Sequence, residues 1–153
     1  YLGFASEQSA TIFTAATLAI SMTAFISVFI YEKLKRNMDL TILLSFTLAA
    51  IFFMGTYFMA NPWSNLICLV LAIMSSNSAA CMLWSRYCPS LYETGLVSSA
   101  TGFLDFMSYA AAAVASKLFA NAVSEIGWKN LILVWFALML AGILVSIRKK
   151  RTC

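Results

Sequence analysis

The chain has 153 residues, of which 62% are hydrophobic and only 10% charged, and its formal net charge is +4. Its mean hydropathy is +0.87, and no polar segment reaches the ~50 residues that a water-soluble domain usually needs. The chain holds no histidine, which excludes His-based acid–base catalysis and His metal ligation. We therefore predict an all-α integral membrane protein whose main partner is the lipid bilayer.

Five apolar segments predict five membrane-spanning helices, each near the ~20 residues that cross a ~30 Å hydrocarbon core. The strongest evidence is a stretch of 46 residues without a charge, from 40 to 85, interrupted only at Asn61-Pro62. The connections between segments are short, so consecutive helices are expected to be antiparallel neighbours. No alternation of polar and apolar residues indicates a strand, which argues against a barrel. The expected spans are 9–31, 40–60, 64–84, 96–120 and 130–147.

Polar side chains are distributed unevenly over these spans. The first, third and fourth carry clusters of polar residues, whereas the second and fifth carry few and are expected to be outer helices that face lipid. In chain order, the first, third and fourth spans are therefore expected to line a polar path, and the second and fifth to lie outside it. Such an order is typical of a transporter bundle around a polar path.

The basic residues predict the orientation in the membrane. Eight of the ten fall in the first connection, the third connection and the C-terminal tail, which five antiparallel spans place on one side. The other side receives Lys117 and Lys129. By the positive-inside rule the C-terminus is cytoplasmic and the N-terminus lies outside. Because the chain starts at Tyr1 without a signal-peptide pattern, we expect it to be part of a longer protein of the cytoplasmic membrane.

Asp105 is the first candidate for a functional residue. It lies about nine residues into the fourth span, roughly 13 Å at ~1.5 Å per residue, which is near the middle of the membrane. A carboxylate at that depth costs at least ~2.5 kcal/mol by insertion scales and is expected to face protein or water. We predict a substrate-pathway or proton-coupling role for Asp105, with a structural acid bonded to a nearby hydroxyl or amide as the open alternative. Its helical face also holds Ser98, Gly102, Tyr109, Ala112 and Ser116, of which Tyr109 is a further pathway candidate.

The third span holds four hydrogen-bonding residues in a row, Ser75-Ser76-Asn77-Ser78. Such a run goes most of the way around a helix, so some of its side chains must point at other helices or into a cavity. Ser76 and Asn77 are candidates for the lining of a substrate path. The alternative is that the serines only pack closely and hydrogen-bond to neighbouring helices.

Enzyme classes that work inside membranes find no support in this chain. A serine hydrolase of the rhomboid kind needs a His base, and a di-aspartate protease needs two intramembrane carboxylates, of which only Asp105 qualifies. The four cysteines form no Cys-x-x-Cys pair and are expected to be free thiols. We predict no enzymatic activity, no metal, no cofactor and no binding to nucleic acid.

Three segments carry a resemblance to a known family. The first connection has an acid followed by clustered basic residues, Glu32, Lys33, Lys35 and Arg36. The segment 92–103 opens the fourth span, and Gly127-Trp128 precedes the fifth. In this order they resemble the C-terminal part of a major facilitator superfamily transporter, from its eighth to its twelfth helix. Glu32 stands where the family usually has Asp, and the nearest likeness is to the organophosphate/phosphate antiporters.

The resemblance implies a secondary active transporter that moves a small solute, such as an organic anion or a sugar phosphate, by alternating access. Its site would lie between two halves of six helices, so the missing N-terminal half of the transporter would be an obligatory partner. The alternative is a self-contained five-helix membrane protein that acts as an oligomeric channel or assembly subunit.

Overall fold

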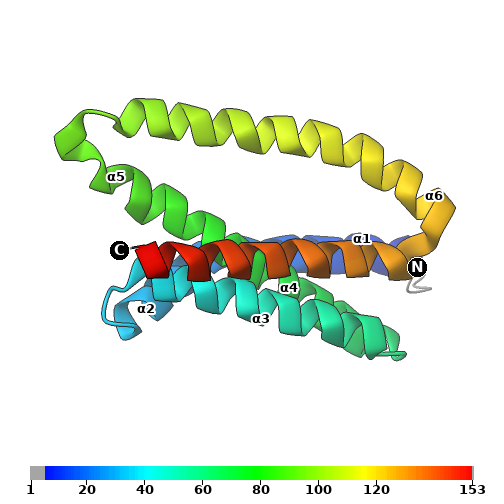
Figure 1. Cartoon of the computed structure of the whole chain (residues 1–153). Coiled ribbons are helices and arrows are strands. Elements are labelled where there is room, and N and C mark those ends of the chain that lie inside the picture. Colours follow the sequence, from blue (N-terminus) through cyan, green and yellow to red (C-terminus); the bar gives the residue numbers. More distant parts are fainter. Residues whose placement is uncertain (1–5, 153) are drawn as a thin grey trace.

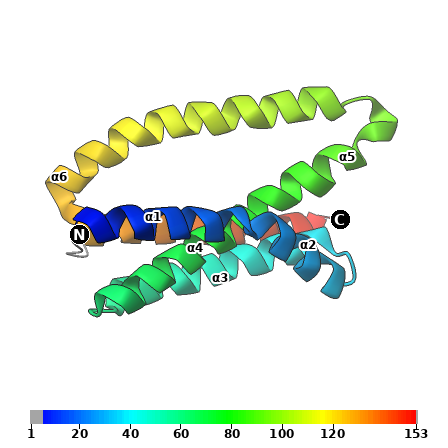
Figure 2. The same ribbon diagram turned by 180° about the vertical axis from the view of Figure 1, so that it is seen from behind.

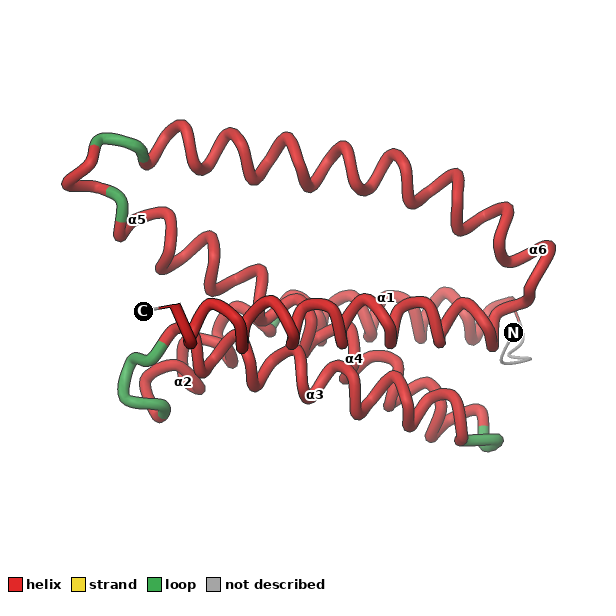
Figure 3. Tube along the Cα trace, in the orientation of Figure 1, coloured by secondary structure: helices red, strands yellow, loops and turns green. Residues whose placement is uncertain are grey.

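The computed structural model describes residues 6–152, with side chains from 8 to 148. The regular structure in this range is entirely helical and contains no strand, which confirms the predicted all-α class. The long helices lie lengthwise beside one another, and short loops join them at the ends (Figures 1 and 3). The helices are α1 (Ser6–Ser21), α2 (Thr23–Lys33), α3 (Met38–Phe58), α4 (Pro62–Met82), α5 (Cys88–Ser90) and α6 (Val97–Thr152). A π-helical turn, Leu83–Tyr87, follows α4, and a 3₁₀ turn, Tyr92–Thr94, follows α5.

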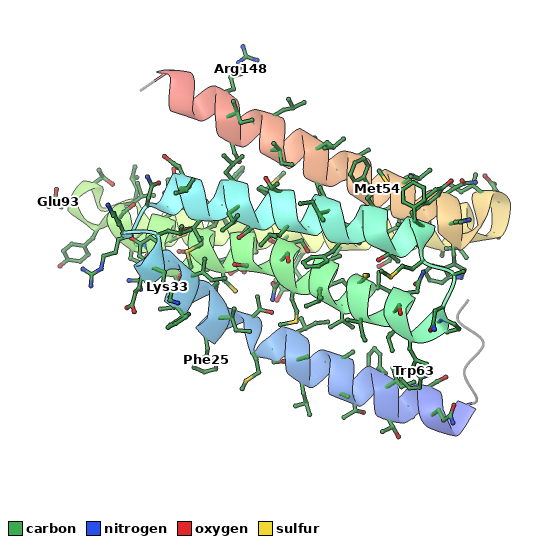
Figure 4. All side chains as sticks on the ribbon, turned by 90° about the horizontal axis from the view of Figure 1, so that it is seen from below. Phe25, Lys33, Met54, Trp63, Glu93 and Arg148 are labelled. Atoms are coloured by element: carbon green, nitrogen blue, oxygen red, sulfur yellow. The ribbon has the colours of Figure 1, made fainter. Side chains whose placement is uncertain are left out.

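Among the described residues, four helical stretches are long and apolar enough to cross a membrane: Gln8–Lys33, Met38–Phe58, Pro62–Ser90 and Val97–Arg148. Large apolar side chains cover their outward surface, as Phe25 does where it points away from the other helices (Figure 4). An apolar outer surface of this size is unfavourable in water but suits hydrocarbon. The fold is therefore that of a multi-pass membrane protein.

The described helices depart from the predicted spans in three places. The third expected span, 64–84, continues through the π turn and α5 to Ser90, into the expected connection. The first expected span, 9–31, is broken at Met22, where α1 ends and α2 begins. The expected connection 121–129 is helical except at Gly127, whose backbone has φ 76° and ψ 164°. The chain turns back on itself there, so α6 consists of a first leg, 97–126, and a second leg, 128–152 (Figures 1 and 2).

Most of the described basic residues gather at one end of the molecule. The loop after α2, the segment around α5 and the end of α6 lie together at this basic end (Figure 1). In Figure 4, Lys33, Glu93 and Arg148 lie toward it, and Trp63 lies toward the opposite end. Lys129 follows the bend of α6 at the opposite end. The side chains of the predicted basic tail, 149–151, lie outside the described residues.

Helix α3 lies at the centre of the packing and contacts α4 and the second leg of α6 most extensively. Small side chains allow this close approach: Ala49 and Ala50 of α3 and Ala72 and Ala79 of α4 are buried. The second leg approaches equally closely, because a Cβ atom at Gly142 would lie 3.0 Å from the Phe46 ring. The second predicted span, which is α3, was expected to be an outer helix that faces lipid. One face of α3 instead packs against other helices, and Thr41, Ser45 and Thr56 are buried there as well.

Two asparagines set the starts of α3 and α4. The side-chain oxygen of Asn37 accepts a hydrogen bond from the Leu40 N–H at 3.0 Å, and that of Asn61 accepts from the Trp63 N–H at 3.0 Å. Both satisfy donors that a helix N-terminus leaves free. Pro62 occupies the first turn, where its missing N–H costs no bond. The predicted break at Asn61-Pro62 is thus confirmed.

The loop after α2 contains two residues in left-handed conformation, Lys35 (φ 54°) and Arg36 (φ 58°). This region costs a non-glycine residue ~1–2 kcal/mol. We expect Lys35→Gly to raise the thermal midpoint of the purified protein, because glycine adopts this conformation without a steric penalty. Lys33→Gly is the matched control and is expected to lower the midpoint, since Lys33 lies in the last turn of α2 and glycine costs a helix ~1 kcal/mol. Equal effects of the two substitutions would contradict the strain assigned to Lys35.

Candidate functional site

The first leg of α6 stands away from the other long helices over most of its length (Figures 1 and 2). It is held at its two ends. Near the bend, the Phe119 ring of the first leg meets the Trp135 ring of the second leg, with centroids 5.9 Å apart, and Trp135 in turn meets Phe53 of α3 at 5.8 Å. At the basic end, α5 contacts α6. Between these attachments the first leg presents most of its surface to the surroundings.

A groove of about 670 Å³ lies on the neighbouring helices. It is shared by α1, α4 and the second leg of α6, and most of its lining is apolar. On α4 the lining residues recur every three or four positions, which is the period of one helical face. The groove-lining residues are Ser9, Ile12, Phe13, Ala16, Thr17, Ile20, Leu66, Leu69, Val70, Ile73, Trp128, Ile132 and Trp135.

The sequence-predicted residues Asp105 and Tyr109 both lie on the first leg. Asp105 is exposed, and the Tyr109 side chain is 76% exposed. Two turns further on the same face, Ser116 donates its hydroxyl hydrogen to the Ala112 carbonyl at 2.8 Å. The polar stripe therefore lies on a surface that the described helices leave open.

Ser76 and Asn77, the two candidates on α4, are half-buried. Asn77 follows Ile73 by one helical turn and so continues the α4 face that lines the groove toward the basic end. Ser76 donates its hydroxyl hydrogen to the Ile73 carbonyl at 2.9 Å, which satisfies its donor within its own helix. Because the first leg stands away from α4, the structure does not bring Asp105 together with Asn77.

The basic loop motif lies at the basic end, where Glu32, Lys33, Lys35 and Arg36 are all exposed. Lys33 Nζ lies 4.8 Å from the centre of the Phe29 ring on its own helix. Tyr31, the residue before the motif, has the Arg86 guanidinium 4.9 Å over its ring, an arrangement that attracts the cation to the aromatic face. The structure thus brings the first and third predicted connections into contact.

Arg86 belongs to the π-helical turn Leu83–Tyr87. Pro89 follows this turn, and a proline has no N–H to donate to the carbonyl four residues before it, which here is Ser85. The proline ring also clashes with that carbonyl in a regular helix, so a wider turn is the local solution. The π turn explains how an apolar span ends with an arginine directed at a neighbouring helix.

Sequence reasoning did not predict the buried polar side chains of α2 and α3 that face α4. The alternative given for the run Ser75-Ser76-Asn77-Ser78, hydrogen bonding to a neighbouring helix, is confirmed at Ser78. Ser45 Oγ and Ser78 Oγ lie 3.2 Å apart across the α3–α4 contact. The spacing of Thr41, Ser45 and Thr56, at intervals of one and about three helical turns, was the available signal, since it places three hydroxyls on one face of α3. The buried polar residues are Thr23, Ser27, Thr41, Ser45, Thr56, Asn65 and Ser78.

The fold and its surface define a multi-pass, all-helical membrane protein with a polar stripe on the exposed first leg of α6. Comparison with known proteins finds no matching family model, no matching curated protein and no matching solved structure.

Proposed function

We propose that this chain is part of a secondary active transporter of the major facilitator type, which moves a small solute across the cytoplasmic membrane by alternating access. The observation that carries the proposal is the first leg of α6, which holds Asp105 away from a groove built by α1, α4 and the second leg. A carboxylate that faced hydrocarbon would cost at least ~2.5 kcal/mol, so its surroundings must be protein or water.

The two legs of α6 support five spans rather than four. A straight helix of 56 residues would be about 84 Å long, far beyond a hydrocarbon core of ~30 Å. Bent at Gly127, each leg has a length that suits one crossing. With five crossings, the basic end is cytoplasmic by the positive-inside rule, and the C-terminus lies there too.

The space beside the first leg supports a partner, which we propose to be the N-terminal half of the transporter. Helices of that half would cover the groove and the face of Asp105 and Tyr109, and Ser76 and Asn77 would line the path between. The solute class follows from the family resemblance alone and is an organic anion or a sugar phosphate. No enzymatic step is part of this proposal.

The size of the native protein tests the proposal against a self-contained five-helix protein. Peptides from this chain are followed by mass spectrometry of source membranes after separation by mass. A product near ~45 kDa, the size expected for about twelve spans with short loops, supports the transporter. A product at the 16.8 kDa of this chain overturns it.

Asp105→Asn is expected to reduce uptake by the intact parent protein in proteoliposomes at least about tenfold, the effect of losing ~1.4 kcal/mol of stabilisation. Asparagine keeps the size of the side chain but cannot carry a charge or exchange a proton. Inorganic phosphate and a hexose phosphate are the probes, each measured with and without a pH gradient.

Glu125→Gln is the control, because Glu125 is an exposed acid on the same leg and lies next to the bend. We expect it to leave uptake unchanged. Uptake by Asp105→Asn that matches the wild type at every pH would remove Asp105 from the coupling mechanism.

A further inference from the structure

A second cavity, of about 180 Å³, lies between α2, α3 and α4, away from the groove described above. Most of its wall is apolar, but four hydroxyl-bearing residues line it: Thr23, Ser45, Ser75 and Ser78. No charged residue is among those that line it. Thr23 is the first residue of α2, immediately after the helix break at Met22.

Thr23 differs from the other hydroxyl residues of its span. Thr14, Thr17 and Ser21 each donate to the carbonyl four residues back, at 2.8–3.0 Å. The corresponding carbonyl for Thr23 is that of Ala19, which accepts from the Met22 N–H at 3.2 Å and receives no hydrogen bond from the Thr23 hydroxyl. Thr23 is 2% exposed, and among the described side chains its Oγ1 is the one buried hydroxyl oxygen without a hydrogen-bond partner.

The three serines at the cavity present acceptors only. Ser75 donates its hydrogen to the Leu71 carbonyl at 2.8 Å, and Ser45 donates its own to the Thr41 carbonyl at 2.8 Å. A hydroxyl has a single hydrogen, so the 3.2 Å contact between Ser45 and Ser78 must be donated by Ser78. Among the hydroxyl groups of the lining residues, Thr23 therefore has the one free O–H, and the serines offer oxygen lone pairs.

We propose that this cavity is a hydration site, in which bound water bridges Thr23 of α2 to Ser75 and Ser78 of α4. A water molecule can accept one hydrogen bond from Thr23 and donate two to the serine lone pairs. This matches the one free donor and the several free acceptors of the lining residues. A buried water needs two to four polar partners and ~10–15 Å³, and the cavity supplies both. The water supplies the hydrogen-bond partner that the Thr23 hydroxyl otherwise lacks.

Other occupants fit this inventory less well. An anion would face oxygen lone pairs and meet a single donor. A sodium ion would leave the Thr23 hydrogen without an acceptor and would sit in a neutral wall that has no carboxylate. A lipid acyl chain matches the apolar wall but leaves the buried Thr23 hydroxyl unsatisfied, which polar groups at membrane depth avoid.

Water-edited solid-state NMR of the full chain in lipid nanodiscs, with labelled threonine, tests the inference in the wild-type protein. Thr41 and Thr56 are internal controls, because both are 0% exposed and both donate to carbonyls of their own helix. We expect magnetisation transfer from water to Thr23 and none to Thr41 or Thr56. Transfer at Thr23 no greater than at the two controls overturns the proposal.

Two variants separate the possible occupants. Ser78→Ala is expected to reduce the transfer at Thr23, and Thr23→Val, which keeps the shape of the side chain and is prepared with labelled valine, is expected to show no transfer from water at position 23. Transfer from protonated lipid chains to Thr23 would assign the cavity to lipid. A Thr23 chemical shift that depends on sodium chloride but not on choline chloride would assign it to an ion. Either result would overturn the proposal that water occupies the cavity.

Discussion

Gly127→Ala is expected to destabilise the protein by about 2–3 kcal/mol and to lower its thermal midpoint by roughly 5 °C or more. The backbone at Gly127 has φ 76° and ψ 164°, a region that is essentially reserved for glycine. A Cβ atom there would meet no atom within 4 Å, so the penalty comes from the backbone and not from crowding. The measurement is thermal unfolding of the purified chain in detergent, followed by circular dichroism.

Gly102→Ala is the matched control for the bend. A Cβ atom at Gly102 also meets nothing within 4 Å, but the residue lies in regular helix within the first leg. Alanine favours helix over glycine by up to ~1 kcal/mol, so we expect the midpoint to stay the same or to rise. A Gly127→Ala protein as stable as Gly102→Ala would mean that the turn between the two legs does not require a glycine.

Asn65→Asp is expected to destabilise the protein by about 3–5 kcal/mol, because it places a carboxylate in a buried position against two carbonyl oxygens. Asn65 is 3% exposed, and its Nδ2 donates to the Thr56 carbonyl at 2.7 Å and to the Met59 carbonyl at 3.1 Å. These carbonyls belong to the end of α3, where a helix has no internal donors left for them. Aspartate removes both donors and directs negative charge at the carbonyl oxygens. Thermal unfolding and the yield of folded protein after extraction from membranes measure the effect.

Asn61→Asp is the control at the same turn. Asn61 is exposed and acts through its oxygen, which accepts from the Trp63 N–H, and aspartate caps a helix about as well as asparagine. A negative charge is also favourable at a helix N-terminus. We expect no loss of stability, and a loss equal to that of Asn65→Asp would show that the turn rejects any charge, whatever the donor pattern.

Asn61 and Asn65 also illustrate what could be read from the sequence. The polar break at Asn61-Pro62 predicted the turn between α3 and α4, since capping and the missing proline N–H are local properties. The role of Asn65 could not be predicted, because its partners are carbonyls of the preceding helix that only the closure of the turn brings within 3.1 Å.

The candidate site also has one part that could be predicted from the sequence and one part that could not. The stripe that contains Asp105 and Tyr109 follows from helical spacing alone. Its position on a leg that stands away from the groove of α1 and α4 depends on the bend at Gly127 and on the Phe119–Trp135 contact. The Gly127-Trp128 pair was visible in the sequence. The segment around it, 121–129, was expected to be a non-helical connection but is helical on both sides of Gly127.

The sequence by itself determined that this protein is helical, apolar enough to reside in a membrane, and basic at one end. These properties depend on composition, on the length of uncharged stretches and on local capping, which each segment carries independently of its neighbours. Only the tertiary structure decided that α3 buries a face of hydroxyls and that the first leg of α6 is left uncovered. Each of these depends on which helices touch, and in an almost uniformly apolar chain the local pattern does not specify contacts, because hydrocarbon and protein interior present nearly the same environment to an apolar side chain.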